Sequence, residues 1–270
     1  MNYELFECQV DQYIAKVMFN RPDKANALPE KGWQELKAIF DEMSHREDVR
    51  VVILHSSGKH FCAGIDLSLL MSFQQKFVLN CEGRKREQFL HTVRELQDCV
   101  NAIERCRKPV IAAIQGGCIG GGVDIVSACD MRYCQAEAYF SIREIDMGMV
   151  ADLGTLQRLP KLIPFGVAAE MAYTGRKVGG EEAVRIGLVN RTYPSEGAMM
   201  EEVEKIAATI AAKSPLSIRG TKEVLQYARD HSVAEGLQQI QLWNAAMFLS
   251  NDLMEAFQSK MEQRKPSFED

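Results

Sequence analysis

The first half of the chain alternates short, almost continuous apolar runs with stretches where apolar residues recur every three or four positions. The short runs predict strands, and the run at 49–55 is apolar enough to be buried on both faces. The expected strands are 14–19, 49–55, 110–114 and 131–134. One helix opens at Pro29 and another covers 88–105. Strands separated by helices predict βα units around a mostly parallel sheet, hence an α/β fold.

Beyond about residue 155 the apolar spacing is helical almost throughout. The expected helices are 156–162, 167–173, 181–186, 198–213, 215–230, 233–249 and 252–263. The last of them are rich in Ala, Met and Leu and need a surface to pack on. They either cover the first half of the chain or pack against another subunit.

The charge pattern bears on the partners of the chain. The 270 residues carry a net charge of −5, which disfavours nucleic acid as a partner. The densest basic stretch, 84–86, is followed by Glu87 and is typical of a solvated helix face. No apolar run approaches the roughly 18 residues of a membrane span, so no membrane partner is expected.

The cysteines and the chain ends bear on the compartment. The eight cysteines form no C-x-x-C pair and no zinc-like cluster with histidine, which predicts reduced thiols and no metal site. The N-terminus resembles neither a signal nor a transit peptide, and the C-terminus lacks a peroxisomal signal. A cytoplasmic location is therefore expected, with the mitochondrial or peroxisomal matrix as the alternative for a processed chain.

A glycine-rich segment at 116–124 gives the first chemical signal. It follows the strand at 110–114 and opens into a helical pattern at 123–129, so it predicts a strand, a tight turn and a helix start. A P-loop would end in Gly-Lys-Ser/Thr, and the Rossmann spacing is absent, so both nucleotide loops are disfavoured. The glycines by themselves require only a crowded turn. In addition, the N–H of Gly121 would suit an oxygen that becomes negative.

A second small-residue bend, at 61–67, follows the strand at 49–55. If that strand and 110–114 are neighbours in a parallel sheet, the loops after them lie at the same edge, where open parallel sheets bind ligands. The N–H groups of Ile65 and Gly121 could then converge on one carbonyl oxygen.

Three acids follow: Asp124, Glu144 and Asp152. Asp124 lies in the first turn of an expected helix, where a carboxylate also serves simply to balance the helix dipole. Asp152 stands among apolar residues, which raise the pKa of a carboxyl and let it exchange a proton near neutral pH. It is equally suited to cap the helix that starts near Gly154. Together with the two loops, the acids indicate an enzyme that makes and quenches an enolate-like anion.

These segments resemble the crotonase (enoyl-CoA hydratase/isomerase) superfamily along nearly the whole chain. They are 20–22 through 26–28, 63–67, the glycine-rich segment, 129–130, 183–189 and 214–215. The resemblance implies the crotonase fold, a spiral of ββα units, with 1–200 as core and 201–270 as a C-terminal helical trimerisation region. It also implies an acyl-CoA thioester substrate, no cofactor beyond the CoA of that substrate, and a homo-oligomer, either a trimer or a hexamer of two trimers.

Within the superfamily, the segments 116–124 and 154–161 together with Glu144 and Asp152 are similar to the Δ3,5-Δ2,4-dienoyl-CoA isomerases. Hydratases of the superfamily hold a water between two glutamates; here the first position is Asp124 and Asp152 is an addition. The resemblance implies an isomerase of fatty-acid β-oxidation that moves a proton from C2 to C6 through an oxyanion-stabilised dienolate. Glu144 is expected at C2 and Asp152 at C6, with the opposite assignment open, and Asp124 is expected to position or polarise them.

Other functions stay open as alternatives. Enoyl-CoA hydratase and Δ3-Δ2-enoyl-CoA isomerase belong to the same superfamily. A crotonase-fold scaffold or RNA-binding protein is a different class, against which the three acids, both donor loops and the acidic charge argue.

The resemblance also implies residues that hold the thioester. Ile65 and Gly121 would supply the oxyanion hole. The residues expected along the CoA path are Lys24, Asn26, Ala27, Leu28, Ala63, Gly64, Ile65, Asp66, Leu67 and Gly121. Candidates for the acyl pocket are Met71, Phe73, Phe77 and Phe89, although core packing is the commoner use of such residues. Lys260 is a candidate for reaching the CoA of a neighbouring subunit.

Overall fold

The chain is built around a 6-stranded sheet with the strand order β1-β2-β3-β4-β6-β9. The computed structural model describes residues 3–76 and 81–270. The strands are β1 (Phe6–Asp11), β2 (Ile14–Phe19), β3 (Val51–Ser56), β4 (Val110–Ile114), β6 (Met131–Gln135) and β9 (Arg191–Tyr193). Only the β1–β2 pair is antiparallel among these pairings, so the expected mostly parallel α/β sheet is confirmed.

The strands expected at 49–55 and 110–114 are neighbours, as the loop argument required. Val52 lies opposite Val110 and Leu54 opposite Ala112 in a parallel pair. Their C-terminal ends therefore meet at one edge of the sheet, and the segments at 61–67 and 116–124 both leave from that edge.

A second, 3-stranded sheet lies beyond this edge, in the order β5-β7-β8. Its strands are β5 (Gly117–Ile119), β7 (Tyr139–Ser141) and β8 (Val178–Gly179). Cys62 forms a parallel bridge with Cys118, so the chain after β3 runs beside β5. Each turn of the chain thus passes from a long strand to a short one and then to a helix, which is the expected ββα spiral.

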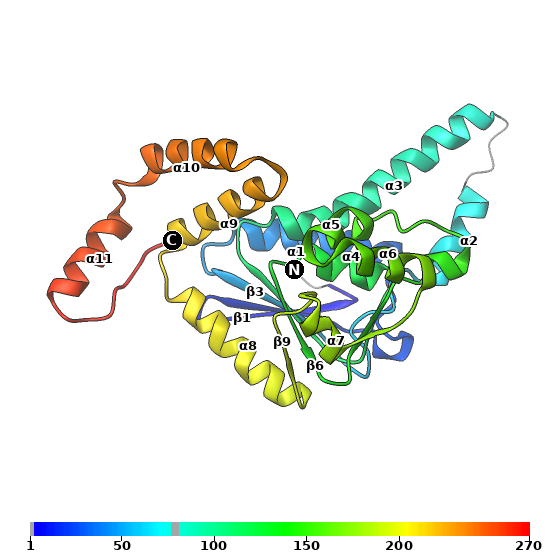
Figure 1. The fold of residues 1–270 in the computed structure, drawn as a ribbon, viewed down its shortest axis with the longest axis horizontal. Helices are drawn as coiled ribbons and strands as arrows, with labels where there is room; N and C mark the ends of the chain where they lie inside the picture. Colours follow the sequence, from blue (N-terminus) through cyan, green and yellow to red (C-terminus); the bar gives the residue numbers. More distant parts are fainter. Residues whose placement is uncertain (1–2, 77–80) are drawn as a thin grey trace.

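Two helices, α1 (Glu30–His45) and α3 (Glu82–Arg105), cover one face of the large sheet (Figure 1). The apolar positions of α1 recur at helical spacing, and Trp33, Leu36 and Ile39 are fully buried. The other face is covered by α8 (Glu196–Ala211), whose Met199 and Val203 pack in one cluster with Val51 and other residues of β3, β4 and β6. Alternate residues of the central strands therefore face two separate apolar layers.

Shorter helices surround the second sheet. They are α2 (Leu67–Lys76), α4 (Gly121–Ser127), α5 (Thr155–Leu162), α6 (Phe165–Thr174) and α7 (Gly180–Arg185). Two 3-10 turns, Pro22–Lys24 and Glu144–Met147, connect strands to helices.

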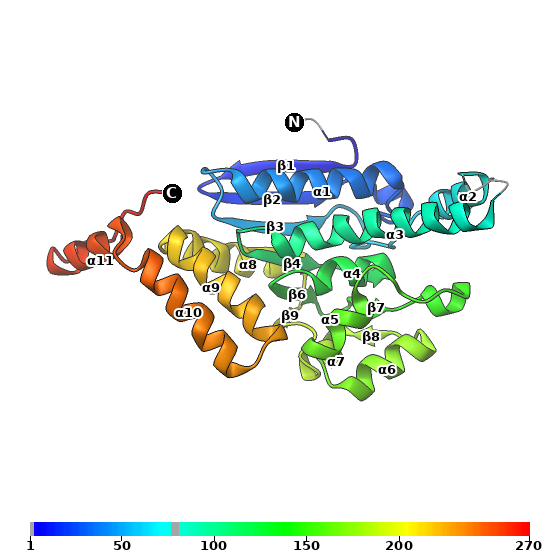
Figure 2. The same ribbon diagram turned by 90° about the horizontal axis from the view of Figure 1, so that it is seen from above.

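Three helices end the chain: α9 (Pro215–Asp230), α10 (Val233–Met247) and α11 (Asn251–Met261). Figures 1 and 2 show α10 and α11 projecting away from the sheets. Their N-termini are capped by Ser232, in a capping box with Glu235, and by Ser250. Leu249 next to them is 94% exposed, and several other large apolar side chains of the two helices are exposed too.

Several boundaries and short strands differ from the sequence expectation. The segment expected as a plain glycine turn contains β5, and β1, β7 and β9 were not predicted. The helix expected at 88–105 begins at Glu82, and the one expected at 123–129 spans Gly121–Ser127. The division of the chain at residue 200 stays a prediction, and α8 runs through that position while its buried face packs on the sheet.

Candidate active site

Two backbone segments meet where the spiral passes from the large sheet to the small one. Leu28 and Ile65 form a parallel bridge, in which Leu28 N–H donates to Gly64 O and Asp66 N–H donates to Leu28 O. This pairing leaves the N–H of Ile65 without an acceptor among residues 3–76 and 81–270. The N–H of Gly121, at the start of α4, likewise has no acceptor in the described parts of the chain. Both donors are free for a ligand oxygen.

Glycine packing brings these two donors together. A Cβ on Gly64 would lie 2.7 Å from the nitrogen of Gly121 and 2.8 Å from the oxygen of Ile119. Gly64 also has a φ of +84°, which favours glycine. A Cβ on Gly121 would in turn lie 3.3 Å from the Cα of Gly64. The two loops therefore touch through their backbones, and no side chain can separate Ile65 from Gly121.

Glu144 lies beside this pair of donors. It is the first residue of the 3-10 turn Glu144–Met147, and its Oε1 is 3.0 Å from where a Cβ on Gly120 would stand. Its Oε2 is buried and has no hydrogen-bond partner among the described residues. Burial raises the pKa of Glu144, and the charge of Asp152 adds to that rise. Such a carboxyl can hold or accept a proton near neutral pH.

Asp152 enters the same site from the loop before α5. Its backbone oxygen accepts a hydrogen bond of 2.7 Å from Nε2 of Gln97 on α3. The residue as a whole is exposed, yet its carboxyl lies deep enough that burial raises its pKa. The alternative role as a helix cap is not used, because the N-cap of α5 is Gly154 and the first N–H of the helix bonds to Asp124 instead.

Asp124 lies beneath the site and does not line its cavity. It is 1% exposed, and its Oδ1 accepts a 2.6 Å hydrogen bond from the N–H of Thr155, the first residue of α5. Burial raises the pKa of Asp124 to about 7. Its carboxyl ties α4 to the segment that carries Asp152, so the contact agrees with the expected positioning role, and the assignment of Asp124 to the catalytic acids stays a prediction.

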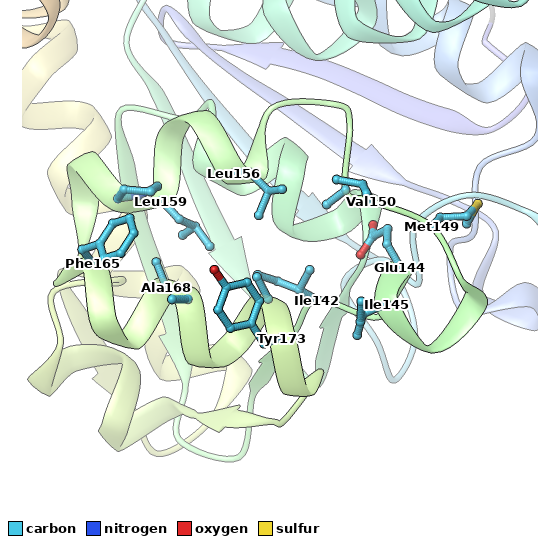
Figure 3. Close-up of a pocket in the computed structure, with 14 residues that line it drawn as sticks. Ile142, Glu144, Ile145, Met149, Val150, Leu156, Leu159, Phe165, Ala168 and Tyr173 are labelled. Carbon is cyan, nitrogen blue, oxygen red and sulfur yellow. The ribbon is translucent and has the colours of Figure 1, made fainter.

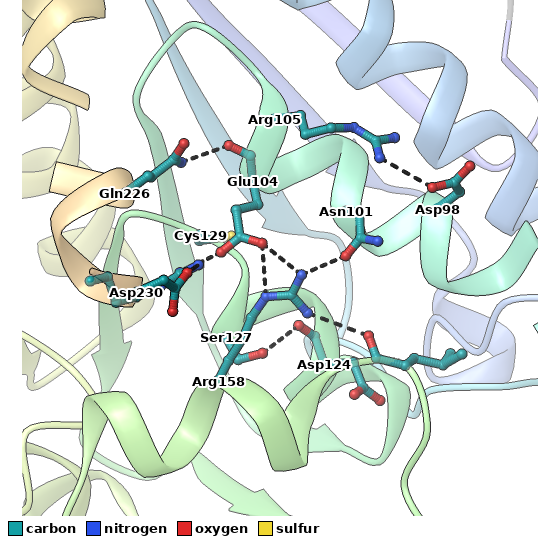
Figure 4. Close-up of polar contacts among 12 residues, drawn as sticks. Asp98, Asn101, Glu104, Arg105, Asp124, Ser127, Cys129, Arg158, Gln226 and Asp230 are labelled. Atoms are coloured by element: carbon teal, nitrogen blue, oxygen red, sulfur yellow. Dashed lines mark hydrogen bonds and ion pairs between the residues drawn. The ribbon is translucent and has the colours of Figure 1, made fainter. Parts of the chain in front are cut away.

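A buried network holds that segment from the other side (Figure 4). The guanidinium of Arg158 on α5 donates to Glu104 Oε2 at 2.8 Å and to Asn101 Oδ1 at 2.6 Å, both on α3. It also donates to the backbone oxygen of Leu153 at 3.5 Å. A Cβ on Gly154 would collide with this guanidinium. The loop at 152–154 thus has its path fixed by α3 and α5 together.

One cavity of about 360 Å³ contains both donors and two of the acids. Its lining residues are Ile65, Leu70, Phe73, Phe89, Thr92, Val93, Leu96, Gly121, Glu144, Met149, Val150, Asp152 and Leu153. Phe73 and Phe89 meet edge to face, with ring centroids 6.1 Å apart. Of the four acyl-pocket candidates, these two line the cavity, Met71 is 69% exposed and does not line it, and Phe77 lies outside the described residues.

A second apolar cavity, of about 300 Å³, lies behind Glu144 and between α5 and α6 (Figure 3). Leu156, Leu159, Ala168 and Tyr173 are among the side chains that line it. Glu144 belongs to both cavities. Its carboxyl therefore has mainly apolar surroundings on two sides.

The residues expected along the CoA path also come together. Ala63 N–H donates to Ala25 O, and the Leu28–Ile65 bridge continues the pairing, so 24–28 and 63–67 form one ribbon. Lys24 and Leu67 are exposed on it. Asn26 and Leu28 are buried, so their side chains do not face a ligand.

Two polar residues of this ribbon, Asn26 and Asp66, form hydrogen bonds or ion pairs with nearby residues. The side-chain amide of Asn26 donates to the backbone oxygens of Ser57 and His60, each at 2.8 Å, and so fixes the turn. Asp66 accepts hydrogen bonds from Ser68 and pairs with Arg21, and these contacts lower its pKa to about 2. Asp66 is therefore a fixed anion at the start of α2.

Among residues 3–76 and 81–270, no group of three or more His, Cys, Asp or Glu residues has the arrangement to hold a metal ion. The eight cysteines are free thiols, as expected, and no described helix is long and apolar enough to cross a membrane.

Comparison with known proteins agrees with this geometry. The family model described as enoyl-CoA hydratase/isomerase matches residues 9–270. The chain belongs to this family. The chain is 45% identical over 266 residues to the peroxisomal Δ(3,5)-Δ(2,4)-dienoyl-CoA isomerase of Arabidopsis thaliana, covering 98% of this chain and 96% of that protein. It is 42% identical over 259 residues to the mitochondrial Δ(3,5)-Δ(2,4)-dienoyl-CoA isomerase of Homo sapiens, covering 94% and 78% of the two chains.

A solved member of the enoyl-CoA hydratase/isomerase family has the same architecture. The crystal structure of enoyl-CoA hydratase from Bacillus anthracis superimposes with a TM-score of 0.88 at 30% identity, covering 98% of this chain and 99% of that one. The crotonase fold expected from the sequence is therefore confirmed.

In this family member, the sequence analysis assigned no role of their own to several residues that shape the site. Val93 and Leu96 were visible only as part of the apolar stripe of a helix, yet they line the cavity. Gln97, Thr155 and Arg158 hold the loop of Asp152 through contacts across 31 to 57 positions of sequence. Such contacts leave no local pattern, and the Gln97 bond is made to a backbone oxygen.

Proposed function

We propose that this member of the family is a Δ3,5-Δ2,4-dienoyl-CoA isomerase acting in fatty-acid oxidation. The observation that carries the proposal is the cavity that holds two free backbone donors, Ile65 and Gly121, together with two carboxyls of raised pKa, Glu144 and Asp152. Relatives that bear this name are 38% to 45% identical to the chain over most of its length.

The reaction needs two separate proton carriers. Converting a 3,5-diene to a 2,4-diene removes a proton from C2 and adds one at C6, and a single carboxyl can scarcely reach both carbons. We assign Glu144 to C2 and Asp152 to C6, and the opposite assignment is the alternative. The thioester oxygen becomes negative in the dienolate and accepts hydrogen bonds from Ile65 and Gly121, each typically worth about 3 kcal/mol.

Asp124 distinguishes this proposal from hydration. Hydratases of the superfamily hold a water between two glutamates, and Asp124 stands at the first of those positions. Here its Oδ1 is bonded to Thr155 N–H and the residue is buried outside the cavity. An acid held in this way is poorly placed to share a water with Glu144, which supports isomerisation over hydration.

A direct assay tests the proposal. Purified protein is mixed with 3,5-octadienoyl-CoA, and the conjugated 2,4-dienoyl absorbance is followed. A steady rise is the expected result. Rapid hydration of crotonyl-CoA with no conjugated product would instead favour an enoyl-CoA hydratase, and a 3-enoyl-CoA converted faster than the diene would favour the Δ3-Δ2 isomerase.

The same proposal covers the rest of the substrate. The ribbon of 24–28 and 63–67 lies next to the donor pair, and we propose that its exposed and backbone groups, including Lys24, Ala63 and Leu67, guide the CoA moiety. Asn26, Leu28 and Gly64 would then support this path through the backbone. No cofactor beyond the CoA of the substrate is required, because two carboxyls and two amide donors suffice for a proton shift.

We also propose a homo-oligomer, a trimer or a hexamer of two trimers. Its support is the exposed apolar surface on α10 and α11, where Leu242, Met254 and Phe257 are each more than half exposed. Large exposed apolar surfaces of this kind mark interaction sites. Lys260 is exposed on α11 and stays a candidate for the CoA of a neighbouring subunit.

The names of the relatives and the charge of the chain bear on its compartment and on its partners. The relatives whose names give a compartment are peroxisomal or mitochondrial, which favours the matrix alternative over the cytoplasmic expectation. The net charge of −5 argues against a role in nucleic-acid binding. Binding of RNA at physiological salt would contradict that part of the proposal.

A further inference from the structure

Asp152 lies at the border of two cavities of opposite character. One is the apolar cavity with the donor pair, and the other is a polar cavity of about 350 Å³ on the far side of the loop at 152–154. The polar cavity is lined by Gln97, Glu104, Gln157, Arg158 and Lys161, among others. Gln157 and Lys161 are exposed, so the polar cavity reaches solvent.

Glu144 has no comparable access. The two cavities that it borders are both lined mainly by apolar side chains, and its Oε2 is buried without a partner among the described residues. The two carboxyls of the site therefore differ in their contact with water. Asp152 adjoins a polar space with room for several water molecules, each with amide or charged groups to bond, and Glu144 does not.

This difference bears on how the site returns to its starting state. In one turnover Glu144 takes the C2 proton and becomes neutral, while Asp152 gives its proton to C6 and becomes a carboxylate. Before the next turnover Asp152 must gain a proton and Glu144 must lose one. The proton can pass from Glu144 to Asp152 within the site, or water can supply Asp152 and accept the proton of Glu144 after product leaves.

The geometry points to the second route: the polar cavity behind the loop at 152–154 is a solvent port through which Asp152 is reprotonated between turnovers. Gln97 positions the residue by holding its backbone oxygen at 2.7 Å, so the carboxyl stays at the wall between the two cavities. Water is the proton donor, and no other reactant is needed. This inference rests on the isomerase activity proposed above.

An isotope experiment on the unaltered protein tests the port. The substrate is 3,5-octadienoyl-CoA with two deuterium atoms at C2, turned over in ordinary water and analysed by mass spectrometry and NMR at early times. The port predicts solvent hydrogen at C6 in nearly all product. Deuterium at C6 would show that the proton passes from Glu144 to Asp152 inside the site, and would overturn the inference while leaving the isomerase proposal intact. Absence of conjugated product would instead reject the isomerase proposal.

A variant pair tests the place of the port. Gln157 lines the polar cavity, and its side chain makes no hydrogen bond with any described residue. Gln157→Trp fills the cavity without removing a contact of Asp152, and we expect kcat to fall roughly tenfold with KM nearly unchanged, as for slowed proton transfer. The share of deuterium at C6 should rise with it. Gln157→Ala is the control and should match the unaltered protein in both measurements.

Either of two outcomes for the variant pair would overturn the port. One is an unchanged kcat and an unchanged isotope pattern in a folded Gln157→Trp protein. The other is an equal loss of kcat in Gln157→Ala, which would assign the effect to the glutamine itself rather than to the filled cavity.

Discussion

A Cβ on Gly64 would stand 2.7 Å from the backbone nitrogen of Gly121. This contact joins two loops that are separated by more than 50 positions of sequence and sets the spacing of the two amide donors. Replacing Gly64 by alanine must push the loops apart, and the φ of +84° adds strain. We expect Gly64→Ala to lower kcat at least ~100-fold, as for loss of an oxyanion-hole donor.

The control for this substitution is Gly166→Ala. Gly166 lies in α6, and a Cβ there would meet nothing within 4 Å. The activity of Gly166→Ala should stay close to that of the unaltered protein, and its melting temperature should be unchanged or slightly higher. A fully active Gly64→Ala protein would contradict the role of the paired loops.

The two carboxyls of the cavity give a second prediction. Asp152→Asn and Glu144→Gln each keep the shape of the side chain but remove the proton transfer. We expect kcat on a 3,5-dienoyl-CoA to fall at least ~100-fold in each, while calorimetry shows CoA-ester binding within about threefold of normal. Asp146→Asn, on the same 3-10 turn as Glu144 but paired with Arg143 at the surface, should be nearly fully active. Full activity of Asp152→Asn would reject the isomerase assignment.

Asp124 gives a prediction for stability against pH. Burial raises the pKa of Asp124 to about 7, so the folded protein binds more protons at this site than the unfolded chain between about pH 4 and pH 7. The contribution of Asp124 to the free energy of unfolding therefore falls as pH rises through that window. Asp124→Asn still offers an oxygen to Thr155 N–H but does not ionise.

The variant should thus gain stability relative to the unaltered protein as pH rises from 5 to 8. The relative gain should be at most on the order of 3 kcal/mol. About two pH units, from pH 5 to pH 7, lie below the raised pKa of Asp124, and each contributes about 1.4 kcal/mol. Urea unfolding at several pH values measures it. A stability difference that does not vary with pH would mean that Asp124 titrates in the ordinary carboxyl range.

Arg158 gives a prediction for the network under the loop of Asp152. Its guanidinium is nearly buried and pairs with Glu104. Burial alone would raise the pKa of Glu104, but Arg158 and Arg229 hold that pKa below its ordinary value. Arg158→Ala leaves Glu104 without its main partner, and we expect a loss of roughly 3 kcal/mol in unfolding free energy. The exposed pair of Arg143 and Asp146 is the comparison, and Arg143→Ala should cost less than about 1 kcal/mol.

The terminal helices give a prediction for assembly. Leu242 on α10 and Leu249 after it are 67% and 94% exposed. If they form the contact between subunits, Leu242→Asp with Leu249→Asp should convert the oligomer to a smaller species in analytical ultracentrifugation. Gln241→Asp, one position away on α10, adds a charge on a different side of the helix and should leave the mass unchanged. An unaltered mass in the double variant would place the interface elsewhere.

The sequence predicted the four inner strands of the large sheet, but not its edge strands β1 and β9 and not the small sheet. The bounds of β2 and β4 were predicted correctly because β4 is a continuous apolar run and β2 is interrupted only by Lys16; such runs are typical of buried parallel strands. β5 has three residues, one of them glycine, inside a glycine-rich stretch. Its pairing with β7 and Cys62 stabilises it, and no local propensity reports contacts of that kind.

In the site, too, some features could be predicted from the sequence and others could not. Ile65, Gly121, Glu144 and Asp152 could be proposed from residue type and from the resemblance, and the structure brings all four to one cavity. The hydrogen bond from Thr155 N–H to Asp124 could not, because it depends on how α4 and α5 pack. The polar cavity behind Asp152 also arises only from three-dimensional packing of α3, α5 and α9.

The side chains of helix α3 have different surroundings in its first part and near its end. Phe89, Val93 and Leu96 in its first part line the cavity that contains Ile65 and Gly121, whereas Val100 and Ile103 near its end are fully buried in the core. Phe89 and Val93 can therefore be exchanged without opening the core, whereas Leu96 also packs against it. A redesign for longer or shorter acyl chains therefore needs changes in only one or two turns of α3. The remaining turns, which pack in the core, can stay as they are.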